Sequence, residues 1–285
     1  MKNLSRRRFI RQGTFAAGAA IALSQLPKQL LANAAAADFP VGFQSWIIRD
    51  AIGKDFAGEL KKMSDMGYQI VEMCSPKGYG GGFAPLASMK ASEMRKIIND
   101  NGFSCPSCHF GFGELNTDLD SRIEWSKELG LEHIVCSSFG LPKDAKMSDW
   151  QKAADQLNVA GEKIKKAGLQ AGFHNHATEF AKLDNQLIYD ELLKRFDPDL
   201  VKLQFQTEVI NLGYKAADYF NKFPGRFISA HLSDWTADKK QAPVGKGVID
   251  WKEFFAAAKA AGVKYHYVEM DAETFKDSIA YIKQV

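Results

Sequence analysis

The chain has 285 residues, 46% of them hydrophobic and 25% charged, which excludes a disordered, collagen-like or multi-span membrane protein. Its four cysteines are too few for a disulfide framework, and its length suits a single α/β barrel of roughly 250 residues. Without the six basic residues of positions 1–34, which include no Asp or Glu, the net charge falls from +3 to −3, so nucleic acid is not an expected partner.

Residues 1–34 have the pattern of an export signal. Residues 5–11, SRRRFIR, resemble the twin-arginine motif, because paired arginines are followed by Phe9 and a further basic residue. The weakly apolar stretch from Thr14 to Leu26 is shorter than the roughly 20 residues of a membrane-spanning helix, and small residues at Ala32 and Ala34 predict cleavage after Ala34. These features predict a signal peptide for the twin-arginine export machinery, a periplasmic protein and no stable membrane insertion. An uncleaved amphipathic anchor or a cytoplasmic basic tail is the alternative.

From Asp38 onward, short apolar runs alternate with segments of helical periodicity. The predicted strands are Val41–Trp46, Tyr68–Cys74, Phe103–Phe110, His133–Ser138, Gln170–His176, Val201–Glu208, Phe227–Ser233 and Tyr265–Met270. The predicted helices are Asp55–Met66, Lys90–Asn101, Ser121–Gly130, Asp149–Ala167, Tyr189–Phe196, Tyr214–Phe223, Trp251–Ala261 and Glu273–Lys283. Eight such repeats, several with Gly between helix and strand, predict one (β/α)8 TIM barrel of the α/β class over residues 38–285. A doubly wound open sheet is the alternative, but no GxGxxG turn follows the first strand.

Polar side chains stand at the ends of the predicted strands, where the active site of such a barrel lies. They are Glu72, His109, His174, Asn175, His176, Gln204, Gln206, Glu208, His231, Asp234, Glu269 and Asp271. Because side chains alternate along a strand, His174 and His176 share a face. A lone His at a strand end is more often a hydrogen-bonded core residue, but this many on neighbouring strands predict one common site. A divalent cation would satisfy them, and imidazole with carboxylate ligands favours Mn, Zn, Co or Fe.

The segment 172–180, GFHNHATEF, resembles a segment of the sugar phosphate isomerase/epimerase family, whose members have a xylose isomerase-like barrel. Shorter matches follow in order along the chain at Val71-Glu72 and at residues 224–227 (PGRF), 231–234 (HLSD), 245–250 (GKGVID) and 268–271 (VEMD). The resemblance implies a divalent metal at the strand ends. It also implies proton abstraction next to a carbonyl, which leads to isomerisation, epimerisation or, in some relatives, elimination.

The same resemblance implies the metal ligands, which are His174 or its neighbour, Gln206, His231 and Glu269. Two departures from the family put ordinary activity in doubt. Relatives have Asp where Gln206 stands and Lys where Ser233 stands. A neutral amide oxygen is a poorer ligand than a carboxylate and does not act as a base at neutral pH.

Roles for the remaining residues follow from this chemistry. We expect Glu269 to be the base, and Glu179 or His109 to return the proton or assist a leaving group. Substrate binding is assigned to His176, Trp46, Arg49, Glu72 and Asp234, with Trp46 and Arg49 forming one wall of the pocket. Because no clear phosphate-binding basic residues are present, the expected substrate is a non-phosphorylated sugar or an oxidised keto-sugar.

Two other functions stay open. Cys105-Pro-Ser-Cys108-His109 matches the C-x-x-C-H pattern of c-type haem attachment, which would make the protein an electron carrier. Against this, the motif lies within a predicted strand, where Cys105 and Cys108 point to opposite faces. The other alternative is a periplasmic sugar-binding barrel that keeps the pocket without the chemistry, for which Gln206 and Ser233 are the evidence.

Overall fold

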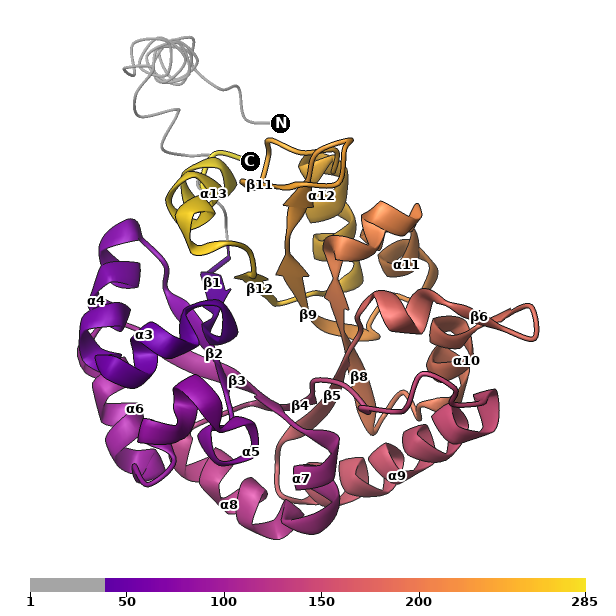
Figure 1. Ribbon diagram of the computed structural model, residues 1–285, viewed down its shortest axis with the longest axis horizontal. Helices are drawn as coiled ribbons and strands as arrows, with labels where there is room; N and C mark the ends of the chain where they lie inside the picture. The colour runs from indigo at the N-terminus through magenta and orange to yellow at the C-terminus, as the bar shows by residue number, and fades with distance from the viewer. Residues whose placement is uncertain (1–38) are drawn as a thin grey trace, which may run out of the picture. The chain divides into compact units, whose positions relative to one another are not determined.

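The structure, a computed structural model, describes residues 39–285, and these form a closed barrel of parallel strands surrounded by helices (Figure 1). The barrel strands lie in the order β1-β12-β9-β8-β5-β4-β3-β2. Their bounds are β1 Val41–Gln44, β2 Ile70–Cys74, β3 Ser104–Phe110, β4 His133–Cys136, β5 Gln170–His174, β8 Val201–Gln206, β9 Phe227–Leu232 and β12 Tyr265–Val268. The predicted (β/α)8 barrel is therefore confirmed. The predicted export segment, residues 1–34, lies outside the described residues.

The helices on the outside of the barrel cover the strands with apolar faces. Their bounds are α3 Arg49–Lys54, α4 Phe56–Met66, α5 Pro76–Tyr79, α6 Ala91–Asp100, α7 Phe112–Thr117, α8 Leu119–Leu129, α9 Met147–Lys166, α10 Ile188–Arg195, α11 Ala216–Lys222, α12 Trp251–Ala261 and α13 Phe275–Ile282. In α9, Trp150, Leu157 and Ile164 are buried at seven-residue spacing, which places them on one stripe. Gly130 ends α8 at φ 93°, a left-handed conformation that favours glycine, as the sequence predicts.

Five strands end two residues earlier than predicted, and the difference shapes the site. The strands β1, β4, β5, β8 and β12 stop at Gln44, Cys136, His174, Gln206 and Val268. After β8 the chain enters a 3-10 turn, η5 (Thr207–Leu212), because the Gln206 side chain accepts a hydrogen bond from the Glu208 backbone N–H at 3.4 Å. Apolar periodicity does not distinguish a strand from such a turn, because both stay partly buried at the barrel rim.

Two short hairpins in the loops were not predicted. β6 (Lys182–Leu183) pairs with β7 (Gln186–Leu187), and β10 (Asp234–Trp235) pairs with β11 (Gln241–Ala242). The second hairpin follows β9 directly and therefore lies at the rim where the predicted site residues gather. Within residues 39–285, no helix combines the length and apolar character needed to cross a bilayer.

Candidate active site

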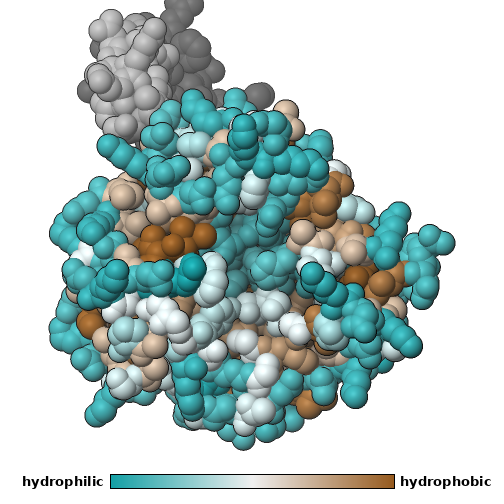
Figure 2. Space-filling view, viewed as in Figure 1, coloured by the Kyte–Doolittle hydropathy of each residue, from teal (hydrophilic) through white to brown (hydrophobic). Residues whose placement is uncertain are grey.

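A cavity of about 390 Å³ opens among the predicted site residues and is lined by several of them. Six of the predicted metal, catalytic and substrate-binding residues lie directly on it: Trp46, His109, His174, His176, Gln206 and Glu269. Trp46 is 39% exposed. In the face that Figure 2 shows, hydrophilic residues gather in a hollow near the centre. The structure thus brings the predicted residues of β3, β5, β8 and β12 to one site.

Glu72 does not line this cavity but lies beneath it, fully buried and surrounded by hydrogen-bond donors. One carboxylate oxygen accepts from Ser107 Oγ at 2.5 Å and Gln204 Nε2 at 2.7 Å. The other accepts from Gln44 Nε2 at 2.6 Å and lies 2.5 Å from His231 Nε2. Both oxygens are occupied, so the predicted substrate-binding role of Glu72 is corrected to that of a buried anchor.

Electrostatics keep Glu72 ionised in this position. Burial alone raises the pKa of its carboxyl, but the neighbouring His109 and His231 outweigh burial and bring the pKa down to about 2. The pKa of His231 shifts in the opposite direction. Burial lowers its pKa, but the carboxylates of Glu269 and Glu72 raise it to about 10. An imidazolium ring therefore donates a hydrogen bond to a carboxylate from each nitrogen.

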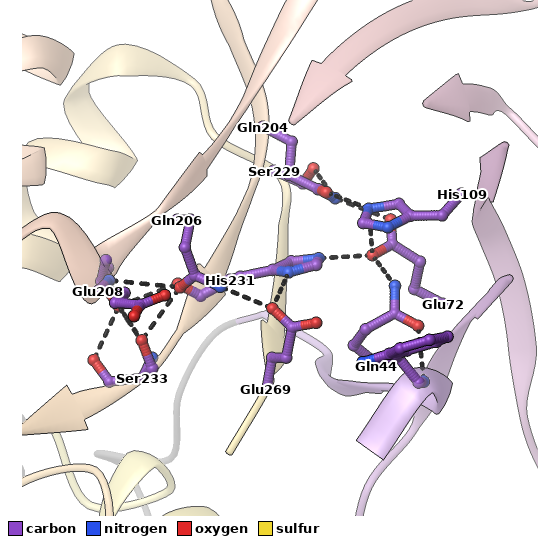
Figure 3. Close-up of polar contacts among 12 residues, drawn as sticks. Gln44, Glu72, His109, Gln204, Gln206, Glu208, Ser229, His231, Ser233 and Glu269 are labelled. Carbon is purple, nitrogen blue, oxygen red and sulfur yellow. Dashed lines mark hydrogen bonds and ion pairs between the residues drawn. The ribbon is translucent and has the colours of Figure 1, made fainter. Parts of the chain in front are cut away.

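Figure 3 shows this chain of groups, which runs from Glu72 through His231 to Glu269. The Nδ1 atom of His231 lies 2.8 Å from Oε2 of Glu269. The same oxygen accepts a hydrogen bond from Gln206 Nε2 at 2.6 Å. Within the described residues no hydrogen bond ends on Oε1 of Glu269, and the side chain is 17% exposed. One oxygen is thus fixed in place while the other remains available to a ligand.

Gln206, which stands where relatives have Asp, is held in one orientation. Its amide oxygen accepts from the Ser233 hydroxyl at 3.0 Å, and its amide nitrogen donates to the Glu269 carboxylate. The orientation cannot reverse without cost, because a carboxylate only accepts hydrogen bonds. Asn175, directly after β5, accepts a hydrogen bond from the Gln206 backbone N–H at 3.2 Å. The two departures from the family, Gln206 and Ser233, therefore contact each other.

His109 and His174 complete the floor of the cavity. The His109 Nε2 atom lies 2.6 Å from Gln204 Oε1, and the two imidazole centroids of His109 and His174 are 4.9 Å apart. Burial lowers the pKa of both rings, so both are neutral at pH 7, the form that binds metals. Neutral imidazoles and a carboxylate are therefore available at one point.

These donors fit a divalent transition metal. His174 Nδ1 is buried and has no hydrogen-bond partner within residues 39–285. One ligand atom each from His109, His174 and His231 lie within 4.8 Å of one another. An unpartnered imidazole nitrogen beside two further imidazoles and a carboxylate is the ligand chemistry that zinc and its neighbours prefer.

Besides Glu72 and His231, three predicted site residues lie away from the cavity lining: Arg49, Glu179 and Asp234. Glu179 is buried, and its carboxylate accepts from the His176 backbone N–H at 2.7 Å, which begins the 3-10 turn η4 (Ala177–Phe180). Burial raises the pKa of Glu179 to about 7. Arg49 stacks on Trp46, with its guanidinium carbon 4.0 Å from the indole centroid. Glu179 thus caps a turn and Arg49 supports the Trp46 wall, while the catalytic role of Glu179 and the substrate-binding role of Arg49 stay predictions.

Asp234 is the clearest correction, because its carboxylate binds the protein's own backbone. It is fully buried and accepts five hydrogen bonds, from the backbone N–H groups of Trp235, Gly245, Gly247 and Ile249 and from the Trp251 indole. A Cβ atom on Gly247 would lie 2.1 Å from an Asp234 oxygen, so glycine is required there. The sequence motif GKGVID therefore wraps around Asp234, which fixes the loop between β11 and α12.

The cysteine motif is buried in the barrel wall. Cys105 and Cys108 lie in β3 with exposed fractions of 6% and 0%, and both are free thiols. Burial raises the pKa of Cys105 to about 12. The His109 ring that would bind haem iron instead contacts Gln204 inside the barrel. This geometry contradicts haem attachment at these residues.

Sequence reasoning missed several residues of the site. Gln44 and Ser107 bind Glu72 from neighbouring strands, and Tyr79 and Trp235 line the cavity from the loops. Glu208, one of the polar residues predicted at a strand end, also lines it. Gln44 and Ser107 could have been found from the sequence, because each is an additional polar residue inside a predicted barrel strand. The loop residues have no comparable signal, because their position depends on the loop fold.

Comparisons with known proteins agree with this geometry. Residues 60–285 match the family model of the xylose isomerase-like TIM barrel. An inosose dehydratase of Geobacillus thermodenitrificans is 23% identical over 214 residues, covering 61% of this chain and 71% of the relative.

Solved structures share the fold. A sugar phosphate isomerase/epimerase from Parabacteroides distasonis superposes with a TM-score of 0.75 and 22% identity, over 88% of this chain and 96% of that one. The IOLI protein with a bound zinc atom superposes with a TM-score of 0.64 and 15% identity, over 86% of this chain and 96% of that one. The matched segment, the closed barrel and the position of the site together show that the chain belongs to the xylose isomerase-like TIM barrel family.

Proposed function

We propose that the protein is a divalent-metal-dependent enzyme that removes a proton next to the carbonyl of a non-phosphorylated sugar. The product forms by isomerisation, epimerisation or elimination. Membership of the family supports this class of reaction, and the similarity to an inosose dehydratase favours elimination of water as one outcome.

The observation that carries the proposal is the state of Glu269. Glu269 lines the cavity, and its Oε2 atom is held by His231 and Gln206 at 2.8 and 2.6 Å, while Oε1 has no hydrogen bond from the described residues. A general base needs this arrangement, because its reacting oxygen must approach a C–H bond at a fixed angle. We assign the proton abstraction to Oε1 of Glu269.

Glu269 is a weak base in this environment. Burial raises the pKa of Glu269, but the charge and hydrogen bond of His231 hold it below its ordinary value. A weak base removes a carbon-bound proton only when the negative charge left behind is stabilised. His109 and His176 line the same cavity and are placed to donate hydrogen bonds to substrate oxygens or to return a proton.

His174, His231 and Glu269 are the residues that would hold the metal, with His109 beside them. His231 would first give up the proton on Nδ1 that it shares with Glu269, because only a neutral imidazole nitrogen binds a metal. When bound, the metal would polarise the substrate carbonyl and its neighbouring hydroxyl. Glu72 contributes by fixing the His231 ring through Nε2, the type of support that orients metal-binding histidines.

The cavity lining carries no cationic side chain within the described residues, which supports a substrate without a phosphate group. That lining, as far as residues 39–285 provide it, contains the carboxylates of Glu208 and Glu269 but neither Lys nor Arg. Phosphate groups are bound in proteins mainly by Arg, Lys and clusters of backbone N–H groups.

The test is turnover of neutral keto-sugars and keto-inositols by the purified protein, followed by NMR. We expect product with the wild type and a loss of at least about 100-fold in rate for Glu269→Gln, the usual contribution of a general base. Glu273→Gln, an exposed carboxylate in η6 (Ala272–Thr274), is the matched control and should retain the wild-type rate. Equal rates for Glu269→Gln and the wild type would contradict the assignment.

One observation favours a second function, a sugar-binding barrel without turnover. The Gln206 amide satisfies Glu269 without a cation, whereas an Asp at this position would leave two carboxylates facing each other. Saccharide binding without bound metal or turnover in the same assay would support the binding protein.

We also propose export to the periplasm by the twin-arginine route, on the basis of residues 5–11 and Ala34. Cell fractionation tests this, and replacement of Arg6 and Arg7 by Lys should retain the protein in the cytoplasm. Periplasmic protein in that variant would contradict the proposal.

A further inference from the structure

The outer part of the cavity differs in chemistry from its floor. We call it the mouth and define it by Trp46, Ile47, Tyr79 and Trp235, which line the cavity but are partly exposed. The floor residues His109, His174 and Gln206 are buried and carry imidazole and amide groups, and the Glu269 carboxylate beside them is mostly buried. Aromatic rings above polar groups form the arrangement that binds a sugar ring by its apolar face and its hydroxyls together.

Trp46 is exposed and yet held in place. At 39% exposure it is the one aromatic residue among the exposed large apolar side chains of residues 39–285. Arg49 stacks on its indole at 4.0 Å and donates a hydrogen bond to its backbone oxygen at 2.8 Å, and Tyr79 packs edge-on at 5.6 Å. Solvent exposure of a large indole is unfavourable, so a fixed indole at the mouth indicates a ligand surface.

Trp235 is fixed from another side by the β10–β11 hairpin. Its indole N–H donates to Ser233 Oγ at 3.3 Å, and its backbone N–H donates to Asp234 at 2.9 Å. The five hydrogen bonds at the Asp234 carboxylate therefore hold a second indole at the mouth. Both indoles are positioned by contacts within the protein, so a ligand would bind them without ordering side chains first.

The volume and the charge of the cavity define what fits at the mouth. About 390 Å³ lies within the range of pockets for ligands larger than a single sugar ring. The cationic side chains needed by an anionic group are absent from the lining within residues 39–285, and Glu208 and Glu269 repel such a group. An uncharged ring is therefore the matching occupant.

We propose that the mouth is a second sugar subsite, in which Trp46 and Trp235 bind a pyranose ring linked glycosidically to the reacting sugar at the floor. The substrate class is then an uncharged glycoside of two rings. The proposal rests on the proposed function, because that function places the reacting sugar at the floor. The second ring is assigned from other residues, those of the mouth.

Isothermal titration calorimetry with glucose, maltose, cellobiose and glucose 6-phosphate tests the subsite. We expect at least one disaccharide to bind the wild type tenfold or more tightly than glucose. Trp46→Ala should weaken disaccharide binding at least tenfold more than glucose binding, and Trp46→Phe should restore part of the difference. Val159→Ala, which removes an exposed apolar side chain from α9, is the control and should change neither affinity.

Three outcomes would overturn the subsite: equal binding of glucose and both disaccharides, an equal loss for every sugar in Trp46→Ala, or tighter binding of glucose 6-phosphate than of the neutral sugars. Glu269→Gln separates this proposal from the proposed function. If its turnover equals that of the wild type while the disaccharide preference stands, the assigned base is wrong and the subsite remains. If turnover depends on Glu269 but Trp46→Ala does not alter sugar preference, the subsite is wrong and the enzyme remains.

Discussion

Replacement of Asp234 by Asn should destabilise the protein strongly, although the two side chains have nearly the same shape. The carboxylate accepts five hydrogen bonds, three of them on Oδ2 and two on Oδ1. The Asn amide retains one acceptor oxygen and turns an NH2 group toward the remaining donors. Two or three hydrogen bonds to a charged group, at about 1.5–3 kcal/mol each, are then lost, so we expect a decrease of about 4 kcal/mol in the free energy of unfolding.

Urea unfolding followed by circular dichroism measures this effect. With a denaturant slope of about 3 kcal/mol per M, the midpoint should fall by more than about 1 M. Asp238→Asn changes an exposed residue of the same hairpin region and is the control. Its urea midpoint should equal that of the wild type. Because Asp234 also holds Trp235, disaccharide binding should weaken under folding conditions. A midpoint for Asp234→Asn equal to that of the wild type would refute the structural role.

Three further predictions test other parts of the structure. His266 is buried with both ring nitrogens unpartnered, and burial lowers its pKa to about 3, so the unfolded state takes up its proton first as the pH falls below about 6.5. Between pH 7 and pH 4.5 the wild type should therefore lose about 2.7 kcal/mol of unfolding free energy more than His266→Phe, as measured by urea midpoints, and equal losses would contradict this. Gln206→Glu places a second carboxylate beside Glu269, so Zn²⁺ should bind at least tenfold more tightly by calorimetry, and an unchanged affinity would contradict the orientation of the amide. Cys105 and Cys108, both buried with raised thiol pKa values, should react with a thiol reagent only after unfolding, and the purified protein should show no Soret absorbance; rapid labelling in the folded state would contradict their placement.

The barrel could be predicted from the sequence because its signals are local. Apolar runs alternate with helical periodicity, and glycines such as Gly67 and Gly130 adopt the left-handed conformation that ends a helix. The convergence of His109, His174, His231 and Glu269 also follows from local signals, since the carboxyl ends of parallel barrel strands meet at one rim.

The roles of individual residues could not be predicted in the same way. Glu72 and Asp234 have the same kind of place in the sequence as Glu269, at or just after a strand end. Their partners decide their roles, and these partners come from other strands or from a loop whose backbone N–H groups converge only after folding. Glu179 is similar, because its buried carboxylate caps the turn in which it lies. A carboxylate at a barrel rim is thus a candidate for catalysis until its hydrogen-bond partners are known.

A comparison of rates with a keto-sugar that carries deuterium on the carbon next to its carbonyl tests the central claim most directly. If Glu269 removes that proton in the slow step, the deuterated substrate should react several-fold more slowly than the protonated one, and Glu269→Gln should react with neither at a measurable rate. Equal rates for the two substrates, together with wild-type turnover by Glu269→Gln, would contradict it.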